Sequence, residues 1–168
     1  MELLPSKKIS RKELKPADHI YSWRFACIYA HHGIYVGEGK VIHYTTAQRS
    51  STGSYSGLFS FIRSSTSYST VGSPCRECGD QSGLGGVICS CIDCFLAGGD
   101  LYLFEYDDIR AIILPNIRRT CSFLSSDSPE IVLRRAYYLL ENGFGDYDLL
   151  GNNCEDFAIY CKTGRRIC

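Results

Sequence analysis

The sequence predicts an α+β fold in which a small antiparallel sheet packs against helices. Strand-forming triplets flank a glycine-rich turn within residues 31–45, and two capped amphipathic helices are expected over 128–143 and 154–162. With 168 residues, 45% of them apolar and 21% charged, the chain can form one domain with its own core. The net charge is zero, so nothing indicates nucleic acid as a partner.

The first residues are basic, and residues 1–14 are interpreted as a lead-in to a single domain over 15–168. A solvated tail is the ordinary role of such a cluster, and peripheral contact with an anionic membrane is the alternative. No apolar run reaches the roughly 18–20 residues of a membrane span, and no signal-peptide core follows the basic start. A cytoplasmic protein is therefore expected.

The clearest strand signal is a β-hairpin. The triplet at 34–36 and the run at 41–44 are rich in Val, Ile and Tyr, and Gly37-Glu38-Gly39 between them is a turn sequence. An apolar and aromatic run over 18–27 precedes the hairpin and has the composition of a strand.

The middle of the chain combines an expected insertion with two more strands. Residues 46–95 are interpreted as the insertion, because a Ser- and Tyr-rich stretch is followed by a cysteine cluster at 75–94. Strands are expected over 101–106 and 111–114.

Two helices are marked by their caps. Ser128 is the expected N-cap of the first, with Pro129 at its first position and Gly143 at its end. Asn153 is the expected N-cap of the second, which Cys154 then opens.

Cys154 is the candidate nucleophile, because a thiol at a helix N-terminus lies in the positive field of the helix dipole. That field favours the thiolate and lowers the thiol pKa, whereas the neighbouring acids Glu155 and Asp156 oppose it. The field alone is not enough, so a catalytic Cys154 needs an imidazole from elsewhere in the chain.

Strand alternation decides which histidines can share a site. His31 and His43 lie twelve residues apart, so a hairpin centred on Gly37 sets them opposite and one centred on Glu38 sets them diagonal on one face. An even loop would place them on opposite faces. With an odd loop, His31 can serve as general base while His43 orients it. The alternative is that His31 and His43 are ordinary strand histidines with no catalytic role. His19 and His32 are interpreted as structural.

The motifs His-His-Gly-Ile-Tyr-Val-Gly at 31–37, Val-Ile-His at 41–43 and Asn-Cys-Glu-Asp-Phe at 153–157 resemble the lecithin:retinol acyltransferase-like (LRAT) family, and its plant members in particular. The resemblance implies a permuted papain-like (NlpC/LRAT) fold. It also implies a triad of nucleophile, base and orienting residue at Cys154, His31 and His43. Tyr29 matches a position associated with the oxyanion in related enzymes.

The resemblance implies an acyltransferase or phospholipase-type hydrolase that acts on lipid esters through a thioester, with no cofactor for the chemistry. Asp156 stands where the animal enzymes tend to have histidine, and this difference bears on the choice of substrate. Two alternatives stay open: a cysteine amidase or peptidase with the same triad, and a non-catalytic zinc-containing interaction protein.

The cysteine cluster indicates a metal site. Cys75 and Cys78 form one CxxC pair and Cys91 and Cys94 another, and two such pairs supply four thiolates for one tetrahedral zinc ion. Cys89 is a fifth thiol that can replace Cys91. One structural zinc is expected; plain reduced cysteines are the alternative.

Overall fold

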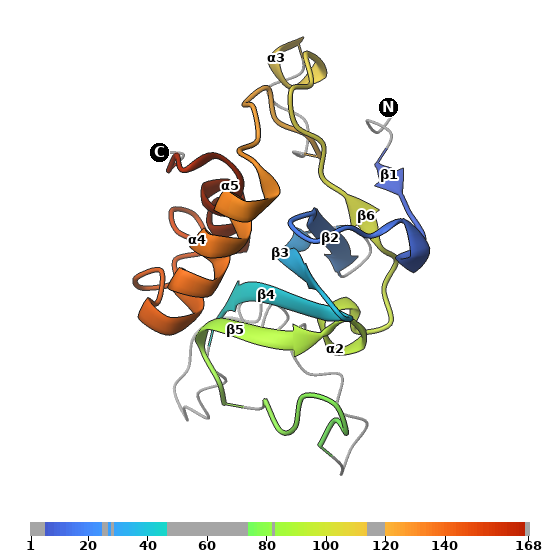
Figure 1. Ribbon diagram of the computed structural model, residues 1–168, viewed down its shortest axis with the longest axis vertical. Helices are drawn as coiled ribbons and strands as arrows, with labels where there is room; N and C mark the ends of the chain where they lie inside the picture. The colour runs from blue at the N-terminus through green and yellow to red at the C-terminus, as the bar shows by residue number, and fades with distance from the viewer. Residues whose placement is uncertain are drawn as a thin grey trace.

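The computed structural model describes residues 6–24, 27, 29–46, 74–81, 83–113 and 120–166 (Figure 1). In this part of the chain an antiparallel six-stranded sheet lies between helices, which confirms the predicted α+β class. The strands follow one another across the sheet in the order β1 (Lys7–Lys8), β6 (Tyr102–Leu103), β2 (His19–Arg24), β3 (Tyr29–Gly37), β4 (Lys40–Thr45) and β5 (Gly86–Cys91).

The predicted hairpin is formed by β3 and β4. Gly33 pairs with His43 and Ile34 with Ile42, so the odd register centred on Glu38 is present. Backbone φ is positive at Gly37, Glu38 and Gly39, where glycine relieves the strain of a left-handed turn. The register shifts between Tyr35 and Gly37, which is a local irregularity beside the turn.

The two faces of the sheet carry separate cores, because side chains alternate along each strand. On one face, α5 (Cys154–Thr163) and α4 (Pro129–Asn142) cover Ile34, Ile42 and Tyr44. On the other face, α2 (Ile92–Leu96) packs against Ile20 and Val41. Any side chain on β3 therefore belongs to one of two different environments.

Both predicted helices are present with the expected ends. Ser128 is the N-cap residue of α4, Pro129 is in its first turn, and Gly143 follows its last residue. Asn153 caps α5 by accepting hydrogen bonds from the N–H groups of its first turn, and Gly164 ends the helix in the left-handed conformation.

Two strand predictions need correction. The strand expected over 111–114 is wrong, because α3 (Arg110–Ile113) is a short helix whose first turn begins at Asp108, an acceptor for the Arg110 N–H. Ile112 and Ile113 are exposed, so their β-branched character reflects no sheet contact. The strand expected over 101–106 is shortened to Tyr102–Leu103.

The cysteine cluster contains structure that the sequence did not reveal. Residues 86–96, all but the last of them within the expected insertion, form β5 and α2, and β5 pairs with β4 along its whole length. Residues 47–73, the Ser- and Tyr-rich part of that insertion, lie outside the described residues. The proposed domain boundaries stay a prediction.

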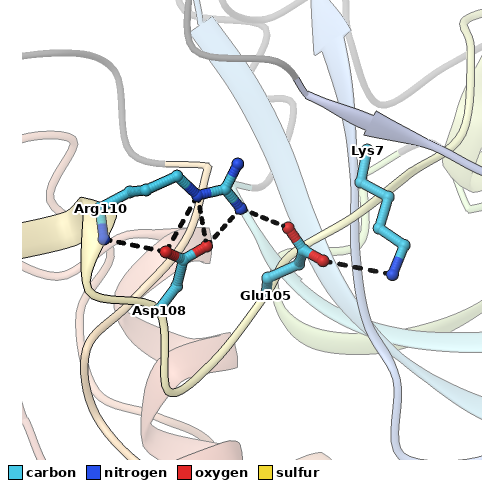
Figure 2. A network of polar contacts seen from close by, with 4 residues as sticks. All are labelled: Lys7, Glu105, Asp108 and Arg110. Carbon is cyan, nitrogen blue, oxygen red and sulfur yellow. Dashed lines mark hydrogen bonds and ion pairs between the residues drawn. The ribbon is translucent and has the colours of Figure 1, made fainter.

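A polar network joins the edge of the sheet to the segment before α3 (Figure 2). Glu105 accepts from Lys7 at 3.2 Å and from Arg110 at 2.8 Å, and Arg110 also bonds to Asp108. The short strand β1 is held to the sheet partly by this exposed network, whose ion pairs each contribute about 0–1 kcal/mol. Among the described residues, the helices are too short or too polar to cross a membrane.

Candidate active site

The histidines at 31 and 43 are in contact. His31 Nε2 lies 2.9 Å from His43 Nδ1, as expected for diagonal neighbours on one face of the hairpin. Both rings are buried, and Phe95 of α2 packs against each of them. The pair thus sits between the sheet and α2.

Cys154 lies at the start of α5, beside the edge of β3 that faces away from β2. Its Sγ donates to the carbonyl oxygen of Ala30 at 3.7 Å. The N–H of His32 and the hydroxyl of Tyr147 lie close enough to lower the pKa of the thiol. Within the described residues the thiol forms a hydrogen bond to this carbonyl and none to the ring of His31. The residue before His31 is therefore in direct contact with the thiol, while the ring itself is not.

Burial dominates the protonation of these groups. It raises the pKa of Cys154 to about 11, an effect to which the charge of Glu155 adds. Hydrogen bonds from His32 N–H and Tyr147 oppose it without cancelling it. Burial also lowers the pKa of His43 to about 3 and that of His31 well below its ordinary value. The resting site consequently holds a neutral thiol beside neutral imidazoles, and the helix dipole does not create a thiolate by itself.

Arg24 and Tyr29 lie on the same face as the histidine pair, because they pair with each other across β2 and β3. Arg24 is buried and donates to Ser22 Oγ at 2.8 Å and to the carbonyl of Phe95. Burial is the main cause of the lowered pKa of His31 and His43, and the positive charge of Arg24 lowers both values further. The oxyanion role of Tyr29 stays a prediction.

The other two histidines form a second pair on the α5 face. His19 Nε2 lies 2.8 Å from His32 Nδ1, and His19 Nδ1 lies 2.8 Å from the hydroxyl of Tyr106. His19 also stacks on Phe104, with ring centroids 4.3 Å apart. The structural role assigned to both residues stays a prediction.

The sequence did not indicate Tyr147 or Arg24. Tyr147 lies in the loop before the Asn153 cap, and its hydroxyl reaches the thiol because that loop is folded against Tyr44. Arg24 is the last residue of β2, where a charged side chain ordinarily marks a strand end at the surface. The one signal that could have indicated Tyr147 is its position in the sequence, a few residues before the Asn153 cap.

The four cysteines of the two CxxC pairs converge. Their sulfur atoms all lie within 4.8 Å of one another, and hydrogen-bonded Sγ pairs are 3.5–3.8 Å apart. Tetrahedral zinc with Zn–S bonds of about 2.3 Å places its sulfurs about 3.8 Å apart. The geometry therefore fits a metal ion. Cys89, the expected substitute, does not belong to this group.

Each pair is a tight turn. Gly79 N–H donates to the carbonyl of Cys75 at 2.9 Å, which closes the first, and Cys94 N–H donates to Cys91 Sγ at 3.5 Å, which closes the second at the start of α2. Backbone N–H groups of Cys78 and Glu77 lower the pKa of Cys75 to about 6. N–H donors of this kind stabilise the thiolates that a metal requires.

The fold and the site together are those of an α+β domain in which a cysteine opens a helix near two hydrogen-bonded strand histidines. The family model of lecithin retinol acyltransferase (LRAT) matches residues 12–167, so the chain belongs to the LRAT family. It is similar to Protein LEAD-SENSITIVE 1 of Arabidopsis thaliana, with 51% identity over 162 residues. That match covers 95% of this chain and 61% of the relative, and it confirms the expected kinship with plant members.

Proposed function

We propose that the chain is a thiol-dependent acyltransferase or acyl hydrolase that acts on lipid esters. The observation that carries the proposal is the hydrogen-bonded pair of His31 and His43 next to the strand residue that contacts Cys154. Membership in the LRAT family, whose described member transfers acyl groups to retinol, supports this class of chemistry. A permuted papain-like arrangement of the elements is part of the same proposal.

The reaction begins with a neutral pair. His31 takes the proton of the Cys154 thiol as Sγ attacks the acyl carbonyl, and the resulting tetrahedral oxyanion collapses to a thioester. The leaving alkoxide receives the proton from His31. Water, an amine or a lysolipid then attacks the thioester and releases Cys154 with its proton restored.

Two groups beside the thiol can stabilise developing charge. The hydroxyl of Tyr147 lowers the pKa of the Cys154 thiol, so it favours the thiolate as the proton leaves. The guanidinium of Arg24 supplies a buried positive charge on the face of the histidine pair. A pKa of about 11 for the free thiol makes such help necessary near neutral pH.

Mass spectrometry of the intact protein after incubation with mixed phospholipid vesicles tests the proposal. We expect an acyl adduct on wild-type protein and on Cys161→Ala, which removes another buried thiol of α5. Cys154→Ala should form no adduct and should lose acyl transfer at least about a thousandfold. Activity of Cys154→Ala within tenfold of wild type would reject the nucleophile, and turnover of peptides in place of esters would favour an amidase.

Variants of the two histidines separate their roles. His31→Ala should be nearly as damaging as Cys154→Ala, because the base is lost. His43→Asn should be milder, because an amide can still bond to His31. Equal loss in both variants would contradict an orienting role for His43.

For the four cysteines we propose one structural zinc ion. Four thiolates leave no open position for water, so the ion would brace the fold and take no part in the reaction. Elemental analysis of protein purified without chelator should find about one zinc per chain. Cys75→Ser and Cys94→Ser should lose it, and Cys89→Ser and Cys154→Ala should keep it. Metal-free wild-type protein of unchanged stability would reject the site.

We further propose peripheral contact between the basic N-terminal residues and an anionic membrane. Three of these side chains are already paired within the molecule, because Lys7, Lys8 and Arg11 each contact a carboxylate. The contact would have to compete with these exposed ion pairs. Flotation with vesicles that contain phosphatidylserine measures it, and equal flotation with neutral vesicles would reject it.

A further inference from the structure

A series of hydrogen bonds, here called the relay, continues from the histidine pair through Ser90 and Gln81, which lie close in sequence to the two CxxC pairs. His43 Nε2 lies 2.7 Å from Ser90 Oγ, and the Ser90 hydroxyl donates to Gln81 Oε1 at 2.5 Å. Gln81 Nε2 in turn donates to the carbonyl oxygen of Cys89 at 2.7 Å. The ring of His31 is thus connected through three side chains to a backbone carbonyl.

The carbonyl oxygen of Cys89 determines which atom donates in each of these hydrogen bonds. A carbonyl oxygen only accepts, so it holds the amide nitrogen of Gln81 and turns the amide oxygen toward Ser90. The Ser90 proton is then committed to Gln81, which leaves Ser90 Oγ to accept from His43 Nε2–H. A neutral His43 protonated at Nε2 has a lone pair at Nδ1.

The tautomer of His43 determines the tautomer of His31. His43 Nδ1 can only accept, so His31 must be protonated at Nε2 for the bond between them to form. A neutral His31 with its proton at Nε2 carries its lone pair at Nδ1. The outcome is one tautomer in which a single nitrogen of His31 is free to take a proton.

We propose that Ser90 and Gln81 are positioning residues that fix this tautomer of His31 through His43. Their part in acyl transfer rests on the proposed function, whereas the tautomer follows from the hydrogen bonds alone. Neither residue belongs to the three motifs that carry the family resemblance.

Sheet register explains why these residues meet. Ser90 pairs with Val41 across β4 and β5, which makes it the diagonal neighbour of His43, just as His31 is on the other side. Two diagonal steps across three strands therefore line up His31, His43 and Ser90 on one face. Gln81 lies in the loop that follows Cys78, and Ser90 directly precedes Cys91. Each CxxC pair is therefore close in sequence to one residue of the relay.

Nitrogen-15 NMR of histidine-labelled protein tests the proposal, because the ring nitrogens report which of them is protonated. In wild-type protein we expect His31 and His43 to be protonated at Nε2. Ser90→Ala should convert His43 wholly or partly to the Nδ1–H form and remove the single tautomer of His31. Ser90→Thr keeps the hydroxyl and should restore the wild-type spectrum. Gln81→Leu should resemble Ser90→Ala.

The matched control is Ser22→Ala, which removes a buried hydroxyl on the same face of the sheet that bonds to Arg24 and to no histidine. Its tautomers should match wild type. Unchanged tautomers in Ser90→Ala would overturn the proposal, as would a wild-type His43 protonated at Nδ1. Both results are independent of enzymatic activity.

Kinetics adds the link to function. Ser90→Ala should lower the rate of acyl transfer about tenfold or more with little change in KM, because it removes orientation of the base and no substrate contact. Ser90→Thr should recover most of the rate. If wild-type protein shows the expected tautomers and transfers no acyl group, the proposed function fails and the relay stands; if Ser90→Ala is fully active, the relay has no part in catalysis.

Discussion

Gly33 lies directly opposite His43, and its lack of a side chain makes room for the histidine pair. A Cβ at this position would come within 2.7 Å of Val41 Cγ1 and 2.9 Å of Phe95 Cε2. Both neighbours are buried, so they have little freedom to move.

We therefore predict that Gly33→Ala destabilises the fold by about 1–3 kcal/mol, as overpacking does in a filled core. It should also move Phe95 or His43 and slow acyl transfer. Urea unfolding measures the first effect. Gly151→Ala is the control, because the nearest atom to its new Cβ lies 3.9 Å away; equal stability of the two variants would contradict the crowding.

At the level of single residues, the sequence predicted the contact between His31 and His43 and missed the rest of the relay. The spacing of twelve residues and an odd turn depend on local signals alone. Ser90 and Gln81 could not be placed, because their positions depend on the pairing of β4 with a strand more than forty residues later. Such long-range register leaves no mark in a single sequence.

Among the elements, α5 depends most on its first turn. Asn153 Oδ1 accepts from the N–H groups of Glu155 and Asp156, at 2.9 and 3.2 Å, and Asp156 returns a bond to the Asn153 N–H. The capping box holds the backbone of Cys154 in place, and with it the thiol.

Asn153→Ala should cost about 1 kcal/mol of stability and fray the start of α5. Hydrogen exchange of the first-turn amides, together with urea unfolding, measures both effects. Asn153→Asp is the control, since it keeps the capping oxygen and loses the amide donor that bonds to Leu149. A loss of equal size in Asn153→Asp would attribute the effect to the Leu149 contact.

Element prediction failed where composition was a poor guide to the local backbone. The Ile-rich segment at 111–113 has strand propensity, yet Asp108 caps it as a helix and its isoleucines face solvent. β5 was missed because its cysteines suggested a metal loop, although Val87, Ser90 and Cys91 are buried in the sheet. The capped helices were predicted well, because capping signals are local.

For the molecule as a whole, four buried neutral histidines make stability depend on pH. Burial lowers the pKa of His32 and His43 to about 3 and that of His19 and His31 well below the ordinary value. The unfolded chain binds protons at these sites first. The stabilising contribution is therefore present above about pH 6.5 and is lost as the pH falls.

We predict that the free energy of unfolding drops steeply from about pH 6.5 to pH 5, by up to about 1.4 kcal/mol per pH unit for each histidine. Urea unfolding at several pH values measures the slope. Carboxyl groups with lowered pKa, such as Asp108, contribute only below about pH 4, so they do not confuse this range. A flat profile from pH 7 to 5 would show that the histidines are not kept neutral by burial.

One hydrogen-bonded histidine pair lies on each face of β3. The length of the turn at 37–39 is therefore constrained. Surface turns usually tolerate insertions and deletions. Here, the gain or loss of one residue would slide β4 by one position while β3 stays bound to β2, and His43 would then face α5 beside His32. Relatives that keep this chemistry should vary in sequence at the turn and not in its length.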